Sequence, residues 1–273
     1  MVEVMTSYKE TEIGSIPTDW AVRPLSDVTV ADGLVRGPFG GALKKEIFVR
    51  NGYSVYEQRN AINCNTDSFR YFIDENKFNE LRRFKVEEGD FIVSCAGTIG
   101  QICRIGQHSP EGVINQALLK ITVDPEIVHP DFFLRVFRSS SFQDRITENS
   151  HGGAMKNLVG MDVFRQVGIP LPQYEEQRAI AEALSDVDAL IERLDALIAK
   201  KRAVKTATMQ QLLTGQQRLP GFEGAWETRR LGEILSVQHG KSQHQVAQQG
   251  GKYPILATSG EIGKASDFLY DKP

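Results

Sequence analysis

The sequence has few cysteines, and none are spaced as in a metal site. Its three cysteines, Cys64, Cys95 and Cys103, form no CxxC motif and leave an odd count. This pattern argues against a zinc site and against a disulfide framework, and it fits a reducing compartment. We therefore expect the three cysteines to be packing residues.

The sequence also lacks a long apolar run and a leader-like start. Its apolar runs are far shorter than a membrane span, and the first residues, MVEVMTSYKE, lack the basic-then-apolar order of a signal peptide. These absences predict a soluble cytoplasmic protein with no membrane contact. Because the net charge is −3, any nucleic-acid surface must be a local basic patch on a mildly acidic chain.

Motifs for catalysis are missing as well. There is no Pro-Pro pair for the clamp of an amino-group methyltransferase, and residues 37–41 (GPFGG) match neither GxGxxG nor GxxxxGK[ST]. Pro130-Asp131 is not followed by the (D/E)xK of a metal-dependent nuclease. Among five histidines, only His239 and His244 approach a ligand spacing. We predict no catalytic residue and no metal site.

Residues 174–214 form the clearest pattern that is present. Apolar side chains recur there at alternating spacings of four and three, the a/d rhythm of a coiled coil; they are Ile180, Leu184, Val187, Ile191, Leu194 and Ile198. Charged residues lie between them, and Gly215 follows the last turn. This predicts a helix of roughly 57 Å that serves as a spacer and assembly surface. An amphipathic helix lying on a globular core would show similar periodicity.

An internal repeat flanks this predicted helix. Residues 16–28 (IPTDWAVRPLSDV) recur as residues 222–234 (FEGAWETRRLGEI), with the Trp, Arg, Leu and acid-aliphatic pair all shifted by 206 positions. A second echo relates residues 52–56 to residues 252–256. The repeat predicts a module at 1–173, the helix at 174–214 and the start of a related module at 216–273.

The first module has an α+β pattern. Strands are predicted at residues 53–56, 91–94, 100–105 and 113–122, bounded by turn residues. One helix is predicted among them, at residues 130–140, with Pro130 in its first turn.

Basic and amide side chains cluster around the predicted turns of this module. Arginine and lysine reach phosphates or guanine, and asparagine pairs with adenine, so these residue types suit DNA recognition. Each residue alone fits a solvated surface better than a DNA contact, whereas the set on the loops of one module favours a nucleic-acid face. The predicted DNA-binding residues are Arg36, Lys44, Lys45, Arg59, Asn60, Thr98, Arg104 and Lys156.

Several motifs, in this order, make the chain similar to the specificity subunit of type I restriction-modification systems. They are residues 14–20 (GSIPTDW), 37–40 (GPFG), 89–92 (GDFI), 97–100 (GTIG), 114–117 (INQA), 151–154 (HGGA), 169–172 (IPLP), 176–181 (EQRAIA) and 212–219 (LLTGQQRL). The resemblance implies a non-catalytic target recognition domain at 1–173, a spacer helix, and an incomplete second recognition domain from 216. It also implies binding to half of a bipartite DNA site, and docking of two methylation subunits and of restriction subunits. S-adenosylmethionine would be bound by the methylation subunit, and no cofactor by this chain.

The incomplete second domain departs from the family pattern. Either the chain is a truncated product, or it is a half-subunit that pairs with a second copy through the spacer helix. Two other functions stay open from the residues alone. One is a stand-alone restriction or methylation enzyme with an unrecognised active site, and the other is an assembly protein that does not bind DNA.

Overall fold

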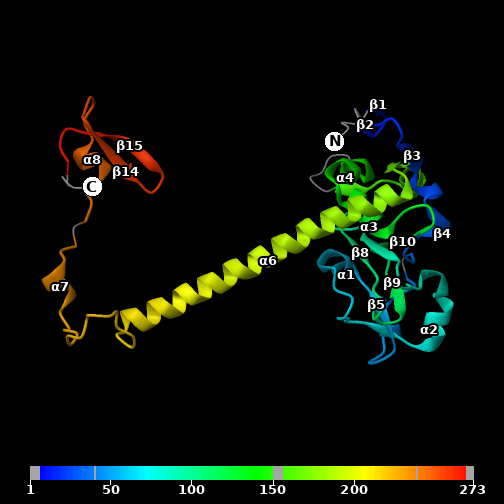
Figure 1. Ribbon diagram of the computed structural model, residues 1–273, viewed down its shortest axis with the longest axis horizontal. Coiled ribbons are helices and arrows are strands. Elements are labelled where there is room, and N and C mark those ends of the chain that lie inside the picture. The colour runs from blue at the N-terminus through cyan, green and yellow to red at the C-terminus, as the bar shows by residue number, and fades with distance from the viewer. Residues whose placement is uncertain (1–6, 40, 150–155, 238, 269–273) are drawn as a thin grey trace. The chain divides into compact units, whose positions relative to one another are not determined.

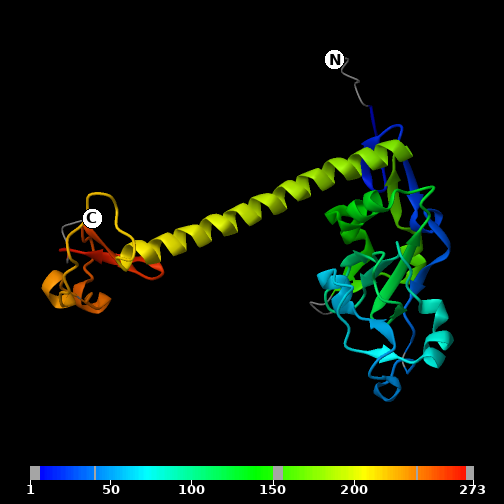
Figure 2. The ribbon, with the colours of Figure 1, turned by 60° about the horizontal axis from the view of Figure 1, so that its bottom comes forward.

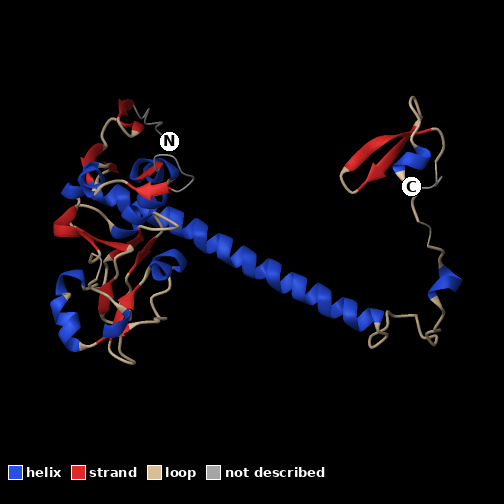
Figure 3. Ribbon diagram, turned by 180° about the vertical axis from the view of Figure 1, so that it is seen from behind, coloured by secondary structure: helices blue, strands red, loops and turns tan. Residues whose placement is uncertain are grey.

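The computed structural model describes residues 7–39, 41–149, 156–237 and 239–268. By its contacts the chain divides into two compact units, residues 1–196 and 197–273. The first unit contains both helices and strands, with runs of consecutive strands, which confirms the α+β prediction (Figure 3). No helix in the described ranges is long and apolar enough to cross a membrane.

The centre of the first unit is an antiparallel four-stranded sheet in the order β4-β10-β7-β8. Its strands are β4 (Thr29–Arg36), β7 (Phe91–Ser94), β8 (Ile102–Arg104) and β10 (Leu118–Val123). Alternate residues of a strand face opposite sides of the sheet. Phe91 and Val93 therefore enter one core and Ile92 the other, and β7 is buried along its whole length.

Helices cover one face of this sheet. They are α3 (Pro130–Arg138), α4 (Ser140–Ile146), α5 (Met161–Gln166) and the start of α6 (Tyr174–Leu213), which contributes Ala181 to the core. The helix predicted at 130–140 is α3, which ends two residues earlier, and α4 follows it. Ser139 separates them, because its hydroxyl accepts a hydrogen bond from Phe142 N at 3.4 Å and so begins α4.

The other face packs against α1 (Gln58–Asn63) and a second sheet in the order β6-β5-β9. These strands are β5 (Tyr53–Tyr56), β6 (Phe72–Ile73) and β9 (Gly112–Ile114), with α2 (Glu75–Glu80) beyond them. The expectation of a single helix among the strands was therefore wrong, because α1, α2, α4 and α5 are also present. Each of these four helices has only six or seven residues. Helices this short show little of the periodicity that reveals a helix.

Two further predictions about this unit were wrong. Residues 113–122 are not one strand, because a turn at Asn115–Ala117 separates β9 from β10. In addition, Cys64 and Cys103 were predicted to be packing residues, but they form a disulfide with each other. They lie 39 positions apart, a distance at which spacing gives no sign of pairing. Cys95 is free and buried, as expected.

Short antiparallel pairs complete the first unit. The hairpin of β1 (Tyr8–Thr11) and β2 (Gly14–Pro17) precedes β3 (Ala21–Pro24), which pairs with β13 (Gly168–Leu171) just before α6. β11 (Thr147–Asn149) pairs with β12 (Lys156–Leu158). β3 and β13 thus join a segment near the start of the chain to the segment just before α6.

The second unit holds α7 (Leu231–Ile234), α8 (Gln243–Val246) and the hairpin of β14 (Tyr253–Ala257) and β15 (Gly260–Ala265). α7 occupies the repeat position of the 3-10 turn Leu25–Asp27, and β14 that of β5. Residues 227–230, which correspond to β3, are not in a strand. The repeat is thus visible in two local elements.

Candidate nucleic-acid interface

Three turns meet at one end of the four-stranded sheet, along the edge formed by the ends of its strands. β4 and β7 end there and β10 begins there, because β10 is antiparallel to both. We call residues 36–39, 96–100 and 115–117 the glycine-turn edge. Each of its turns comes from a different motif of the sequence, namely GPFG, GTIG and INQA.

Backbone contacts hold the three turns together. Gly37 N donates to Leu118 O at 2.9 Å, and Cys95 N donates to Ala117 O at 2.8 Å. A Cβ atom on Gly37 would lie 1.9 Å from Asn115 O, so a side chain cannot fit there. Glycine therefore allows the first and third turns to touch.

The middle turn is fixed by side chains. The Ser94 hydroxyl donates to Thr98 O at 2.5 Å and accepts from Gln101 N at 3.0 Å. Gly100 has a φ of 77°, and Gln143 Nε2 of α4 donates to its carbonyl at 3.2 Å. The turn is thus tied to both its own strand and the helical layer.

The edge presents cationic, amide, hydroxyl and aromatic side chains. Phe39 is 88% exposed, Thr98 and Gln116 are exposed, and Arg36 is half-buried. Burial raises the pKa of the Cys95 thiol to about 12, and the positive charge of Arg36 opposes this rise. These groups can contact phosphates, pair with base edges and stack on bases.

α1 begins beside this edge. Gln58 Nε2 lies 3.0 Å from the position of a Cβ on Gly97. The next residue, Arg59, is half-buried; its Nη2 donates to Ser68 O at 2.9 Å, and its Nε lies 3.6 Å from a Glu57 carboxylate oxygen. Gln58, Phe39 and Gln116 were not among the predicted DNA-binding residues, although GPFG and INQA contain two of them.

Asn60 has a structural position within α1. It is 2% exposed; its Oδ1 accepts from Glu57 N at 2.8 Å, and its Nδ2 donates to Asn65 O at 2.8 Å and Ser68 O at 3.1 Å. The amide is therefore used in capping α1 and in holding the turn that follows.

The other predicted DNA-binding residues do not belong to the glycine-turn edge, or their side chains lie outside the described part of the chain. Lys44 and Lys45 are exposed at the 3-10 turn Lys45–Ile47, next to the core of the second sheet. Arg104 pairs with Asp131 of α3 at 3.2 Å, opposite Phe91 at the other end of β7. Lys156 begins β12, but its side chain, like residues 150–155 with the HGGA motif, lies outside the described part of the chain.

The first turns of α6 are anchored to the first unit. Gln177 is 1% exposed; its Oε1 accepts from His129 N at 2.8 Å, and its Nε2 donates to Pro172 O at 3.0 Å. Further along, Arg135 of α3 forms an ion pair with Asp188 and donates to Ser185 Oγ at 3.2 Å. The motif EQRAIA therefore fixes how α6 leaves the core.

Beyond these anchors, the predicted apolar stripe is exposed. Ile180 packs against the core, whereas the following stripe residues are about half-exposed: Leu184, Val187, Ile191, Leu194 and Ile198. α6 runs as one uninterrupted helix (Figures 1 and 2), which confirms the predicted helix within one residue of its end. A row of exposed large apolar side chains on a helix marks an interaction surface.

The family description "Type I restriction modification DNA specificity domain" matches residues 17–200 of the chain. The putative MjaX specificity subunit of Methanocaldococcus jannaschii is 25% identical, over 98% of this chain and 64% of that protein. The StySPI specificity subunit of Salmonella potsdam is 24% identical, over 81% of this chain and 49% of that protein. The chain thus spans less than two thirds of the length of these relatives.

Solved structures share the fold. The HsdS subunit from Thermoanaerobacter tengcongensis has a TM-score of 0.52 at 14% identity, over 75% of this chain and 47% of that one. A chain from a structure that addresses complex assembly and conformational transition of the type I R-M system has a TM-score of 0.53 at 16% identity, over 71% and 45% of the two chains.

These comparisons confirm the resemblance found in the sequence motifs. They also confirm the prediction of a recognition component rather than an enzyme, because the matched domain is one of DNA specificity and these curated relatives are named specificity subunits. Since the family match covers more than half of the sequence, this chain belongs to the family of type I restriction-modification DNA specificity proteins.

Proposed function

We propose that the chain recognises one half of a bipartite duplex DNA site through the glycine-turn edge, in the cytoplasm, within a type I restriction-modification complex. The observation that carries this proposal is the meeting of three motif turns at one sheet edge, with Arg36, Phe39, Thr98 and Gln116 presented together. Loops on a rigid scaffold are the usual position of recognition residues.

The side chains of the edge suit different parts of a duplex. Arg36 can bind a phosphate or pair with guanine, and Gln116 and Gln58 can pair with adenine in the major groove. Phe39 can stack on a base or wedge between two bases. We propose that Asn60 and Arg59 shape the adjacent turn rather than read bases, since the Asn60 amide and Arg59 Nη2 already bond to protein groups.

Methylation and restriction subunits would dock on the faces of α6 that flank the apolar stripe, and the chain would present an adenine to the methylation subunit. Charged side chains cover these faces; they are Glu182, Asp186, Asp188, Glu192, Arg193 and Asp195. Such residues can form polar contacts with other subunits after the apolar stripe is covered.

We further propose that an antiparallel α6 helix of a second copy covers the stripe. Acidic residues dominate α6 up to Asp195, whereas the following part carries Lys200, Lys201, Arg202 and Lys205. An antiparallel arrangement places the acidic part of one helix beside the basic part of the other, whereas a parallel arrangement places like charges together. A second copy would also bring a second glycine-turn edge.

Methylation of a random duplex library tests the proposal. The chain is mixed with a type I methylation subunit and S-adenosylmethionine, and methylated adenines are located by sequencing. A common bipartite sequence that is absent without the chain supports the proposal. Salt-independent or absent duplex binding by an assembled complex would favour a protein that only assembles subunits.

A further inference from the structure

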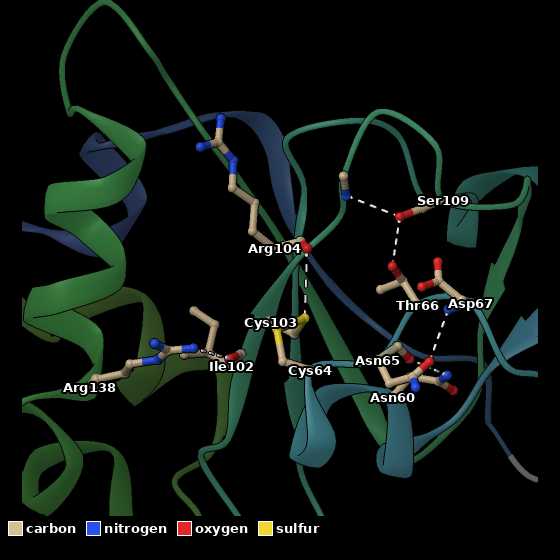
Figure 4. Close-up of a disulfide and its surroundings, with 11 residues drawn as sticks. Asn60, Cys64, Asn65, Thr66, Asp67, Ile102, Cys103, Arg104, Ser109 and Arg138 are labelled. Carbon is tan, nitrogen blue, oxygen red and sulfur yellow. Dashed lines mark hydrogen bonds between the residues drawn. A yellow bond between two sulfur atoms is a disulfide. The ribbon is translucent and has the colours of Figure 1, made fainter. Parts of the chain in front are cut away.

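The disulfide of the first unit joins the end of a short helix to a strand of the central sheet. Cys64 ends α1 and has a φ of 43°, a left-handed conformation that is uncommon for a residue with a side chain. Cys103 lies at the centre of β8, opposite Ile92 of β7, and is 1% exposed. The bond therefore ties a helix end and its following turn to the central sheet (Figure 4).

The two cysteine residues differ in their exposure to solvent. Cys64 is exposed, and a cavity of about 300 Å³ opens beside it, lined by Cys64, Gly100, Gln101, Arg138 and Gln143 among others. A small thiol can therefore reach Cys64 but not the buried Cys103. Exposed disulfides are the exchangeable ones, and disulfides of reducing compartments are commonly transient or redox-sensing.

We propose that Cys64 and Cys103 form a reversible exchange site for low-molecular-weight dithiols, and that its redox state sets how firmly α1 and the turn at 64–68 are held. This proposal rests on the proposed function for its consequence in DNA binding, because α1 carries Gln58 beside the glycine-turn edge.

The exchange proceeds in two balanced steps. A thiolate of the dithiol attacks Cys64 Sγ, the bond between the two cysteine sulfurs breaks, and Cys103 leaves as a thiolate that takes up a proton. The second thiol of the reagent then displaces Cys64, which is also protonated, and the reagent becomes a disulfide. Two electrons and two protons thus pass to the pair. The released Cys103 thiol can donate a hydrogen bond to Arg104 O, which lies 3.6 Å from its sulfur (Figure 4).

After reduction, only non-covalent contacts hold the turn. Asn60 bonds to Asn65 and Ser68, and Thr66 Oγ1 lies 2.9 Å from Ser109 Oγ. Two further bonds of this segment, from Arg59 Nη2 to Ser68 O and from Asp67 N to Asn65 Oδ1, are exposed, and water can replace such bonds at little cost. Loss of the covalent bond therefore increases the local opening of residues 57–70.

Hydrogen-deuterium exchange of the full chain tests the proposal, after treatment with either oxidised glutathione or dithiothreitol. We expect peptide mapping to show the Cys64–Cys103 bond only in the oxidised sample, and residues 57–70 to exchange several-fold faster in the reduced sample. Cys64→Ser should exchange like the reduced protein in both conditions. The control Cys95→Ser should keep the full response, because Cys95 takes no part in the bond.

Two results would overturn the proposal. One is alkylation of both cysteines by iodoacetamide in denaturant after oxidised glutathione treatment, and the other is a bond that forms without any change at 57–70. Binding to a random duplex library is measured in both states in parallel. A redox response in exchange, without duplex binding in either state, would support the exchange site and refute the DNA-recognition function.

Discussion

Gln177 Oε1 accepts a hydrogen bond from His129 N at 2.8 Å, and this contact joins the long helix α6 to the segment that precedes α3. The same amide donates to Ile127 O at 3.2 Å and to Pro172 O at 3.0 Å. A single buried side chain therefore satisfies three backbone groups from two segments. The direction in which α6 leaves the first unit depends on it.

Replacement of Gln177 by alanine should destabilise the first unit. The substitution leaves three buried backbone groups without partners, which costs about 1–3 kcal/mol for each group that water does not reach. Urea unfolding of the variant and of wild type measures the loss. Gln173→Ala is the matched control, because Gln173 is exposed and should change stability little. Equal stability of the two variants would contradict the anchoring role.

Ile191→Glu should prevent the proposed pairing of α6 helices without unfolding the chain. Ile191 is 51% exposed, so the change costs little in the monomer but places a carboxylate in the apolar contact of the pair. Ala196→Glu places the same charge on the opposite face of α6 and serves as control. Sedimentation equilibrium should show monomers for Ile191→Glu and dimers for Ala196→Glu. Dimers of both would show that the stripe is not the contact.

Arg36→Ala should weaken duplex binding more than Arg104→Ala. Arg36 lies on the glycine-turn edge, whereas Arg104 is at the other end of β7 and is paired with Asp131. If Arg36 binds a phosphate, its loss should also reduce the slope of log affinity against log salt by about one. Titrations of a duplex at several salt concentrations measure both quantities. A larger effect at Arg104 would move the DNA-binding surface away from this edge.

The stability of the first unit should fall at alkaline pH. Burial raises the pKa of Cys95 from 9.0 to about 12, and burial likewise raises the pKa of Tyr56 from 10.0 to about 12. Both groups bind their protons more tightly in the folded chain, so unfolding releases protons above pH 9. The free energy of unfolding should decrease as the pH rises from 9 towards 12.

Urea unfolding at about pH 8 and at about pH 10.5 measures this decrease. Cys95→Ala removes the contribution of the thiol and should make the decrease smaller, whatever it does to the stability at the lower pH. An identical pH dependence of the variant and of wild type would show that the thiol does not titrate on unfolding.

The sequence was most informative where one physical pattern dominates a segment. Ile180 to Ile198 show the spacing of a helix that leaves one apolar face open, and the structure contains that helix. Tyr53–Tyr56 and Phe91–Ser94 are apolar runs bounded by turn residues, and both are strands. In these segments the local pattern and the tertiary environment agree.

Contacts between distant segments were not predictable in this way. The turn at Asn115 interrupts an apolar run and is held by bonds to distant segments, such as Asn115 N to Tyr56 O and Cys95 N to Ala117 O. The Cys64–Cys103 pair is brought together by the packing of α1 on β8. The glycine-turn edge also depends on contacts between distant segments. Its motifs were visible one by one, but their meeting depends on the order of strands in the sheet.

The most direct test of the account is a selection of bound sequences from a random duplex library. The complex of this chain with a methylation subunit is compared with complexes that carry Phe39→Ala or Gln116→Ala. We predict a short enriched sequence for wild type, and a loss of preference at one or two positions for each variant. Enrichment of the same sequence by both variants, with unchanged affinity, would contradict DNA recognition by the glycine-turn edge.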